Sequence, residues 1–191
     1  MNKNSVQRIV SLILVLSTLL ACLVVPAFAA AGQTYTKVKV SKTPTTVDTF
    51  KGVPAKYIPG TGNSNSGTYC CARYVSNFYK KMYGVTVSNL MTGRTPKVSG
   101  KNTVKKVSTP KAGDIYYQRN SGGSGHWAIV KKVTKVKSGV YKVQLIEQNW
   151  KWKSGKVTYA AKNRTIQTNT YGKTYGVKFF RVYKKNGKSL N

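Results

Sequence analysis

Apolar side chains between residues 69 and 84 recur every three to four positions, which is the spacing of one helix face. Gly84 then follows as a typical residue just beyond a helix end. A turn-rich segment over residues 60–68 precedes the helix, and Thr68 or Ser66 is the expected N-cap. The pattern predicts a helix that starts with a cysteine and buries one face. The apolar positions of this face are Cys71, Tyr74, Val75, Phe78 and Met82.

After Gly113 the pattern changes to the alternation of polar and apolar residues that is typical of β-strands. Ser138-Gly139 is a turn signal within this region, so the strands on either side are expected to form a hairpin. One helix followed by an antiparallel meander predicts an α+β fold. The expected strands cover residues 114–117, 126–133, 140–149, 156–160 and 176–183, the last of which closes the sheet.

Two weaker segments flank the helix. Residues 30–51 are polar and rich in Thr and Lys, and we expect a mobile leader or one edge strand there. Residues 85–113 are basic and rich in turn residues, so they are expected to wrap the surface, with a short second helix near residues 88–91.

The N-terminus has the pattern of an export signal. Lys3 and Arg8 precede an apolar run over residues 9–25, and Ala27-Phe28-Ala29 fits a signal-peptidase site. The run is short for a membrane span, so cleavage is expected to leave a chain without integral membrane association. The mature protein is then secreted or associated with the cell wall.

Lipoprotein processing is the alternative to this cleavage. Leu19-Leu20-Ala21-Cys22 fits a lipobox, in which Cys22 would carry the lipid. The apolar run continues past Cys22, however, where a lipoprotein usually turns polar. Signal-peptidase cleavage is therefore the expected route.

The composition is strongly basic, with 33 Lys and Arg against 3 acidic residues and a net charge of +30. Loss of Lys3 and Arg8 with the signal would leave +28. Such an excess predicts affinity for polyanions, which for an exported protein are anionic wall polymers such as teichoic acids. No helix-turn-helix, zinc or RNA-binding motif accompanies the charge, so nucleic acid is not the expected partner. No cofactor and no metal are expected.

Cysteine usage points to chemistry rather than to cross-linking. Without the signal the chain keeps only Cys70 and Cys71, and adjacent cysteines cannot join distant parts of a fold. At the start of a helix, unpaired N–H groups and the helix dipole favour the thiolate of Cys71. The alternative is a small buried cysteine that packs the helix.

The remaining rare residues complete a thiol-hydrolase set. His126 is the only histidine and opens a predicted strand, and Glu147 and Asn149 are expected to share one face of the next strand. In such a set the thiolate of Cys71 attacks a carbonyl and the histidine protonates the leaving amine. A carboxylate or amide fixes the orientation of the imidazole ring.

Four motifs occur in order between residues 55 and 183: Cys71-Ala72-Arg73-Tyr74-Val75, Pro110-Lys111-Ala112-Gly113-Asp114-Ile115, Gly125-His126-Trp127-Ala128-Ile129-Val130 and Glu147-Gln148-Asn149. Together they resemble the CHAP domain, the cysteine- and histidine-dependent amidohydrolase/peptidase family related to papain-like and NlpC/P60 hydrolases. The resemblance implies a papain-like α+β fold. An N-terminal helix would carry the cysteine and pack on an antiparallel sheet that carries the His and the Glu/Asn pair.

The resemblance also assigns roles. Cys71 matches the nucleophile, His126 the base, and Glu147 and Asn149 the acid and amide that support the histidine, whereas Asp114 is expected to bond loop backbone. Many members have glutamine where this chain has Cys70, so backbone N–H groups such as that of Cys71 are the expected oxyanion donors.

The expected organisation is a signal peptide over 1–29, a polar basic leader over 30–54, a CHAP-like domain over 55–185 and a tail over 186–191. The expected function is that of a monomeric, exported cysteine hydrolase that cleaves amide bonds of bacterial peptidoglycan as an amidase or endopeptidase. The alternative is a non-enzymatic cationic protein that binds cell wall or nucleic acid on a hydrolase fold.

Overall fold

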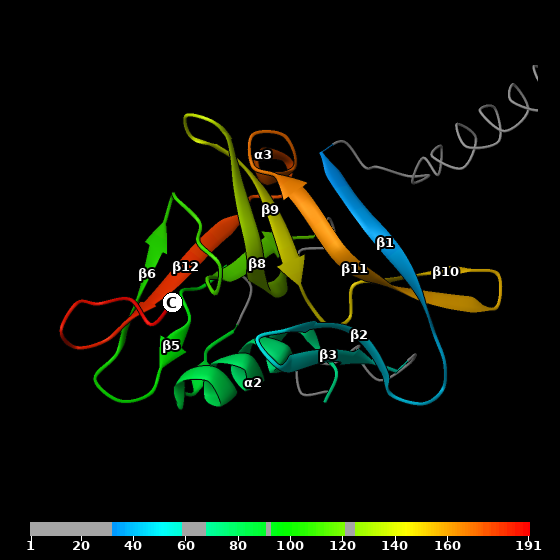
Figure 1. Ribbon diagram of the computed structural model, residues 1–191, viewed down its shortest axis with the longest axis horizontal. Coiled ribbons are helices and arrows are strands. Elements are labelled where there is room, and N and C mark those ends of the chain that lie inside the picture. The colour runs from blue at the N-terminus through cyan, green and yellow to red at the C-terminus, as the bar shows by residue number, and fades with distance from the viewer. Residues whose placement is uncertain (1–31, 59–67, 91–92, 121–124) are drawn as a thin grey trace, which may run out of the picture.

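The computed structural model describes residues 32–58, 68–90, 93–120 and 125–191 (Figure 1). The expected signal peptide, the lipobox and most of the loop before the helix lie outside these residues. Within the described part of the chain, no helix is long and apolar enough to cross a membrane.

Eight of the described strands form one antiparallel sheet. Its order is β1-β11-β9-β8-β7-β12-β6, with β10 paired beside β11 (Figure 1). The fold is therefore mostly antiparallel sheet with a few helices, in agreement with the predicted α+β class. The strands are β1 (Gln33–Val40), β6 (Thr103–Val107), β7 (Ile115–Arg119), β8 (Gly125–Lys137), β9 (Val140–Ile146), β10 (Lys151–Ser154), β11 (Val157–Gln167) and β12 (Lys178–Tyr183).

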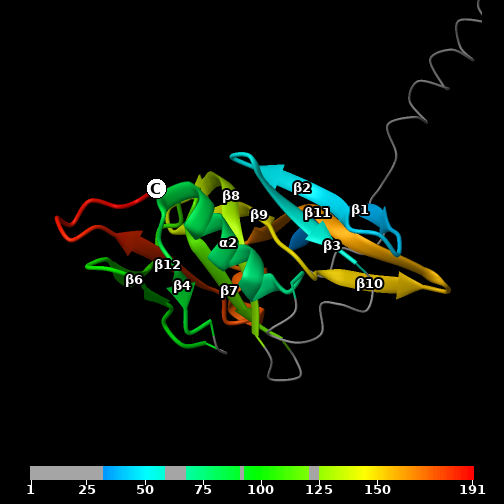
Figure 2. The ribbon, with the colours of Figure 1, turned by 90° about the horizontal axis from the view of Figure 1, so that it is seen from below.

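Smaller elements cover this sheet. The long helix α2 (Cys71–Tyr83) crosses it next to the β2–β3 hairpin, as Figure 2 shows. The short helix α3 (Tyr171–Thr174) links β11 to β12. The remaining elements are β2 (Thr45–Phe50) and β3 (Val53–Tyr57), which pair with each other, and β4 (Val87–Ser88) and β5 (Lys97–Val98), which do the same.

Local chemistry sets both ends of α2. Cys70 is the N-cap, with an extended backbone and a sulfur that accepts a hydrogen bond from the N–H of Arg73 at 3.4 Å. The expectation that Thr68 caps the helix is wrong, because Thr68 lies in the turn two residues before the N-cap; Ser66 lies outside the described residues. Gly84 ends the helix in the left-handed region, and its N–H donates to the carbonyl of Lys80 at 3.1 Å.

The sheet is packed on both faces. Alternate residues of β8 divide between the two cores: Trp127 and Ile129 face the α2 side, while Ala128 and Val130 join a second cluster around Tyr171. On the α2 side the helix supplies its predicted apolar face, with Tyr79 buried as well and Met82 only partly buried. Packing on two faces holds the start of β8 rigidly against the start of α2.

Three local expectations differ from the structure. Residues 88–90 are not helical; Val87 and Ser88 form the strand β4, and Asn89 adopts a left-handed conformation with φ of 56°. The segment over 85–113 supplies the edge strand β6, so it joins the sheet as well as the surface. For this reason β12 does not close the sheet but lies between β7 and β6. Residues 30–51, expected as a leader or edge strand, contain the edge strand β1 and also β2.

Candidate active site

The thiol of Cys71 meets the imidazole of His126 where α2 and β8 begin. Cys71 is 8% exposed and His126 is 4% exposed, so the pair is almost closed off from solvent. Burial raises the pKa of Cys71, but the charge and hydrogen bond of His126 and the N–H groups of Trp127 and Ala72 outweigh it, and the net shift is downward. The arrangement favours a thiolate beside an imidazolium.

Glu147 holds the other side of the imidazole. Its Oε2 lies 2.7 Å from Nε2 of His126, and both side chains are buried. The Nδ1 atom is thereby left as the ring nitrogen for the thiol of Cys71. Burial lowers the pKa of His126, yet the combined effect of Cys71 and Glu147 raises it to about 9. The carboxylate thus stabilises the imidazolium form.

Gly125 allows β8 to begin at this point. A β-carbon at residue 125 would collide with the ring of Tyr117 on the neighbouring strand β7. The glycine permits the close approach of the two strands, and the histidine that follows is held in the ladder opposite Gln118. The Gly-His motif therefore has a packing reason as well as a chemical one.

Behind Glu147 lies a fully buried arginine that the sequence did not single out. Arg164 on β11 donates from Nε to Oε1 of Glu147 at 2.6 Å and from its Nη2 to Oε2 at 2.8 Å. Its remaining amino group, Nη1, donates to Gln118 at 3.0 Å, to the hydroxyl of Tyr171 at 3.3 Å and to Gln33 at 3.4 Å. Burial raises the pKa of Glu147, but Arg164 and His126 together lower it to about 2.

Trp150 lies against both charged partners of Glu147. Its ring centroid is 4.8 Å from that of His126, and the guanidinium carbon of Arg164 lies 4.2 Å from it. An indole in this position excludes water from the imidazole and stabilises the cation by a cation–π contact. Trp150 itself is partly buried.

The two adjacent cysteines have different environments. Cys70 is 2% exposed, and burial raises the pKa of its thiol. Its carbonyl accepts from Nε2 of Gln148 at 3.3 Å, while Oε1 of Gln148 accepts from the N–H of Lys56 on β3 at 2.9 Å. Gln148 therefore ties the start of α2 to β3, and Cys70 acts as a capping residue.

The predictions for Asn149 and Asp114 had different outcomes. Asn149 was expected to share a strand face with Glu147, and this is wrong, because β9 ends at Ile146 and Asn149 takes a left-handed conformation with φ of 61°. The chain turns here to enter β10. Asp114 accepts from the N–H of Lys111 at 2.7 Å, which agrees with the expected bond to loop backbone.

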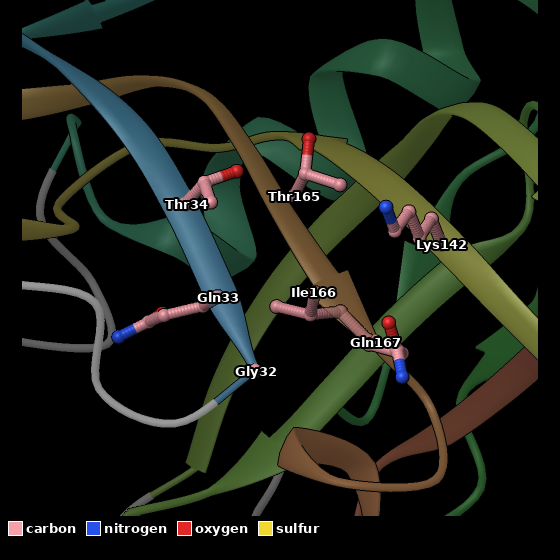
Figure 3. Close-up of a pocket in the computed structure, with 7 residues that line it drawn as sticks. All are labelled: Gly32, Gln33, Thr34, Lys142, Thr165, Ile166 and Gln167. Atoms are coloured by element: carbon pink, nitrogen blue, oxygen red, sulfur yellow. The ribbon is translucent and has the colours of Figure 1, made fainter. Parts of the chain in front are cut away.

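Two of the hollows in the described surface differ in what lines them. The first, of about 370 Å³, lies beside the start of α2 and includes Thr68, Tyr69 and Gln148 together with Lys56, Lys80 and Lys81. The second, of about 290 Å³, lies between β1, β11 and β9 (Figure 3). Lys142, Thr165 and Ile166 line it, and its lining contains no thiol, imidazole or carboxylate. Neither lining contains Cys71 or His126, and of the two only the first includes residues that directly precede α2, Thr68 and Tyr69.

Comparison with protein families agrees with this geometry. Residues 61–149 match the family model of the CHAP domain. The match identifies a CHAP-like domain over these residues. No curated protein and no solved structure matched the chain. Cys71, His126, Glu147 and Asn149 all lie inside the CHAP match, whereas Arg164 lies beyond its last residue. A CHAP domain implies hydrolase activity of the amidohydrolase or peptidase kind.

Sequence reasoning missed Arg164 and Gln148. Arginine is rare in this lysine-rich chain, and that rarity is a signal that could have drawn attention to Arg164. Its pairing with Glu147 depends on how β11 folds back beside β9, which periodicity does not reveal. Across the described residues of the CHAP domain and its surroundings, no group of three or more His, Cys, Asp or Glu is placed to hold a metal ion.

Proposed function

We propose that the protein is an exported cysteine hydrolase that cleaves amide bonds of bacterial peptidoglycan. The observation that carries this proposal is the buried line Cys71, His126 and Glu147 within a CHAP domain. The line has the order of a nucleophile, a base and an orienting acid in a papain-like hydrolase. A thiol with a lowered pKa beside a histidine with a raised pKa is poised to react near neutral pH.

In the proposed reaction the Cys71 thiolate attacks the carbonyl carbon of the amide. The carbon–nitrogen bond breaks, the imidazolium of His126 gives its proton to the leaving amine, and a thioester remains on the sulfur. His126 then takes a proton from water, the resulting hydroxide attacks the thioester, and the acid product leaves while the thiolate–imidazolium pair is restored. Backbone N–H groups at the start of α2, that of Cys71 among them, are the proposed hydrogen-bond donors to the oxyanion.

The hollow beside α2 supports a peptide substrate that carries carboxylates. Lys56, Lys80 and Lys81 surround it, and the residues just before the nucleophile form part of its wall. Lysine ammonium groups attract carboxylates, which peptidoglycan stem peptides contain at their ends and side chains. We propose that part of the stem peptide occupies this hollow during cleavage, whether the cut is of the amidase or of the endopeptidase kind.

The surface charge supports binding to anionic wall polymers such as teichoic acids. All three acidic side chains are buried and paired: Asp48 with Lys131, Asp114 with Arg181, and Glu147 with Arg164. Of the 33 Lys and Arg, Lys3 and Arg8 precede the described region and three pair with these acids, so a large excess of cationic side chains remains. No acidic side chain is left on the surface to compensate them.

This charge also favours a second candidate function, that of a cationic wall-binding protein without hydrolysis. The two candidates differ in what they release from purified walls. Wild type should bind walls and liberate soluble fragments, whereas folded Cys71→Ala should bind equally and release none. Cys70→Ala should keep most of the activity, because Cys70 serves as the cap of α2.

The experiment is to incubate reduced protein near pH 7 with walls that retain or lack teichoic acid, and to identify the products by mass spectrometry. Binding should weaken as salt is raised, because exposed charges are screened beyond about 8 Å at physiological ionic strength. Salt-sensitive binding by wild type without any released fragment would leave only the cationic binder. The mass of the products distinguishes an amidase from an endopeptidase.

Export is part of the proposal and is tested separately. The intact mass of the protein recovered outside the cell should correspond to a chain that begins at Ala30 or Ala31. A diacylglycerol adduct on Cys22 would instead identify a lipoprotein.

A further inference from the structure

Arg164 joins the reactive pair to a part of the chain outside the CHAP match. It comes from β11, and its further partners are Gln33 on β1, Gln118 on β7 and Tyr171 on α3. We propose that Arg164 is a positioning residue for hydrolysis, which holds both oxygens of Glu147 so that Oε2 stays on Nε2 of His126. This role rests on the proposed cysteine hydrolase mechanism.

The geometry of the contact favours positioning over simple charge balance. Two parallel N–H···O bonds of 2.6 and 2.8 Å fix the carboxylate plane, which a single point charge cannot do. The guanidinium itself is fixed on its other edge by Gln118, whose Oε1 also accepts from Tyr116 at 2.7 Å and Tyr171 at 3.2 Å. Because the guanidinium of Arg164 is hydrogen-bonded on both edges, it also fixes the position of the Glu147 carboxylate.

Electrostatics gives Arg164 a second effect on the same site. A carboxylate buried beside His126 alone would be costly, and it would reduce that cost by taking up a proton. The Arg164 cation keeps Glu147 ionised and offsets part of the negative potential that Glu147 would otherwise exert on the Cys71 thiol. Loss of Arg164 should therefore make the Cys71 thiolate harder to form.

Few other titratable groups lie close to the line formed by Cys71, His126 and Glu147. Tyr116 from β7 and Tyr171 from α3 face Glu147 and Arg164, and burial raises the pKa of each, so both stay neutral through the working range of pH. Next to Cys71 lies Cys70, whose pKa burial raises. The charge that responds to substitution at 164 is therefore carried by Glu147, His126 and Cys71.

The test uses the rate of alkylation of Cys71 by iodoacetamide as a function of pH, together with kcat and KM on a defined muropeptide. Alkylation in a Cys70→Ala background reports on one thiol and needs no substrate. Arg164→Lys keeps the charge but loses the two-pronged grip, and Arg164→Met loses both. We expect the midpoint of the alkylation profile to move to higher pH in both variants, further in Arg164→Met, with kcat reduced by about tenfold or more and KM little changed.

Arg181→Lys is the matched control. Arg181 grips Asp114 with the same two atoms, from Nε to Oδ1 at 2.8 Å and from Nη2 to Oδ2 at 2.7 Å, but touches no part of the reactive line. Its substitution should lower the melting temperature and leave the alkylation midpoint in place. If Arg164→Met does not fold, the proposal is still tested by comparing the alkylation midpoints of Arg164→Lys and Arg181→Lys.

A double substitution separates positioning through Glu147 from an independent effect. In a Glu147→Gln background, Arg164→Lys should add little further loss of kcat, because the group it positions is already altered. Additive losses, or Arg164 variants that lose stability with an unmoved alkylation midpoint, would overturn the proposal. Failure of wild type itself to cleave muropeptides would overturn the proposed function instead, and the two failures are thus distinct.

Discussion

Two arginine–carboxylate pairs are buried in this protein, and they share a two-pronged geometry but differ in the third partner of the carboxylate. Asp114 is gripped by Arg181 and also accepts from the backbone of Lys111 and from Asn191 at 2.7 and 2.9 Å. All these donors are permanent. Glu147 is held by Arg164, and its third partner is His126, whose imidazole can gain or lose a proton.

The difference shows how one structural device serves two purposes. A carboxylate surrounded by permanent donors fastens chain segments, here the loop before β7, the strand β12 and the C-terminal residue Asn191. A carboxylate with one titratable partner relays the position and charge of its arginine to that partner. The two sites should therefore respond in opposite ways when each carboxylate is neutralised.

The largest contrast is expected between Glu147→Gln and Asp114→Asn. Glu147→Gln should lower turnover by a factor on the order of 10²–10⁴, since the imidazolium loses its charged partner. Asp114→Asn should leave turnover per folded molecule close to wild type but cost about 3–5 kcal/mol of unfolding free energy, because it breaks a buried pair. Steady-state kinetics and urea unfolding of both variants test this contrast.

Glu147→Gln also leaves a buried arginine without its anion, so some loss of stability is expected there too. The contrast therefore rests on turnover, and equal turnover in the two variants would mean that Glu147 is as structural as Asp114. If Asp114→Asn lost turnover as strongly as Glu147→Gln, in addition to stability, the role of Asp114 would not be purely structural.

A smaller contrast concerns pH. The active form needs the His126 imidazolium, whose pKa is raised to about 9, so kcat/KM should fall as pH rises through that value. The same raised pKa contributes stability that is complete below the unfolded value of about 6.5 and is lost as pH rises through about 9. In Glu147→Gln the alkaline fall should begin at lower pH, whereas in Asp114→Asn it should not move.

The acid side has the opposite sign. The pKa of Glu147 is lowered to about 2, so its contribution to stability is present above the unfolded value of about 4.3 and is lost as pH falls toward 2. Urea midpoints measured between pH 2 and 5 should therefore change less steeply in Glu147→Gln than in wild type. If the urea midpoints changed equally steeply with pH in both proteins, the pKa of Glu147 would not be lowered in the folded state.

The smallest expected effect concerns the two hollows. Lys80→Gln, beside α2, should raise KM by up to about fivefold with kcat unchanged, since an exposed ion pair contributes at most about 1 kcal/mol. Lys142→Gln, in the hollow between β1, β11 and β9, is its control and should leave KM unchanged. An equal rise in both would assign the effect to overall charge rather than to a subsite.

Much of the site could be predicted where the contacts are local or follow a fixed period. The apolar face of α2 and its end at Gly84 follow from helix spacing and from the left-handed preference of glycine. The hairpin of β8 and β9 turns at Ser138-Gly139 as its turn signal indicates. That hairpin places Glu147, just past the end of β9, near His126 at the start of β8, and scarcity alone drew attention to both residues.

The misses share a physical cause. Asn149 failed to share a face with Glu147 because the chain leaves β9 after Ile146, and period-2 alternation ends where the strand ends. The position of β12 between β7 and β6 could not be read from chain order, because strand order depends on long-range pairing. Cys70 caps α2 because the helix begins two residues later than a cap at Thr68 would require.

By itself the sequence determined the amphipathic helix, the antiparallel strands, the basic charge and the order of the rare reactive residues, because each depends on neighbours a few positions apart. Only the tertiary structure decided which of many cations pair with the three acids, and that Arg164 lies behind Glu147. A buried charge is stable only where its partners converge in space. For Arg164 these partners come from β1, β7 and α3 and from the end of β9, so no local pattern could contain them.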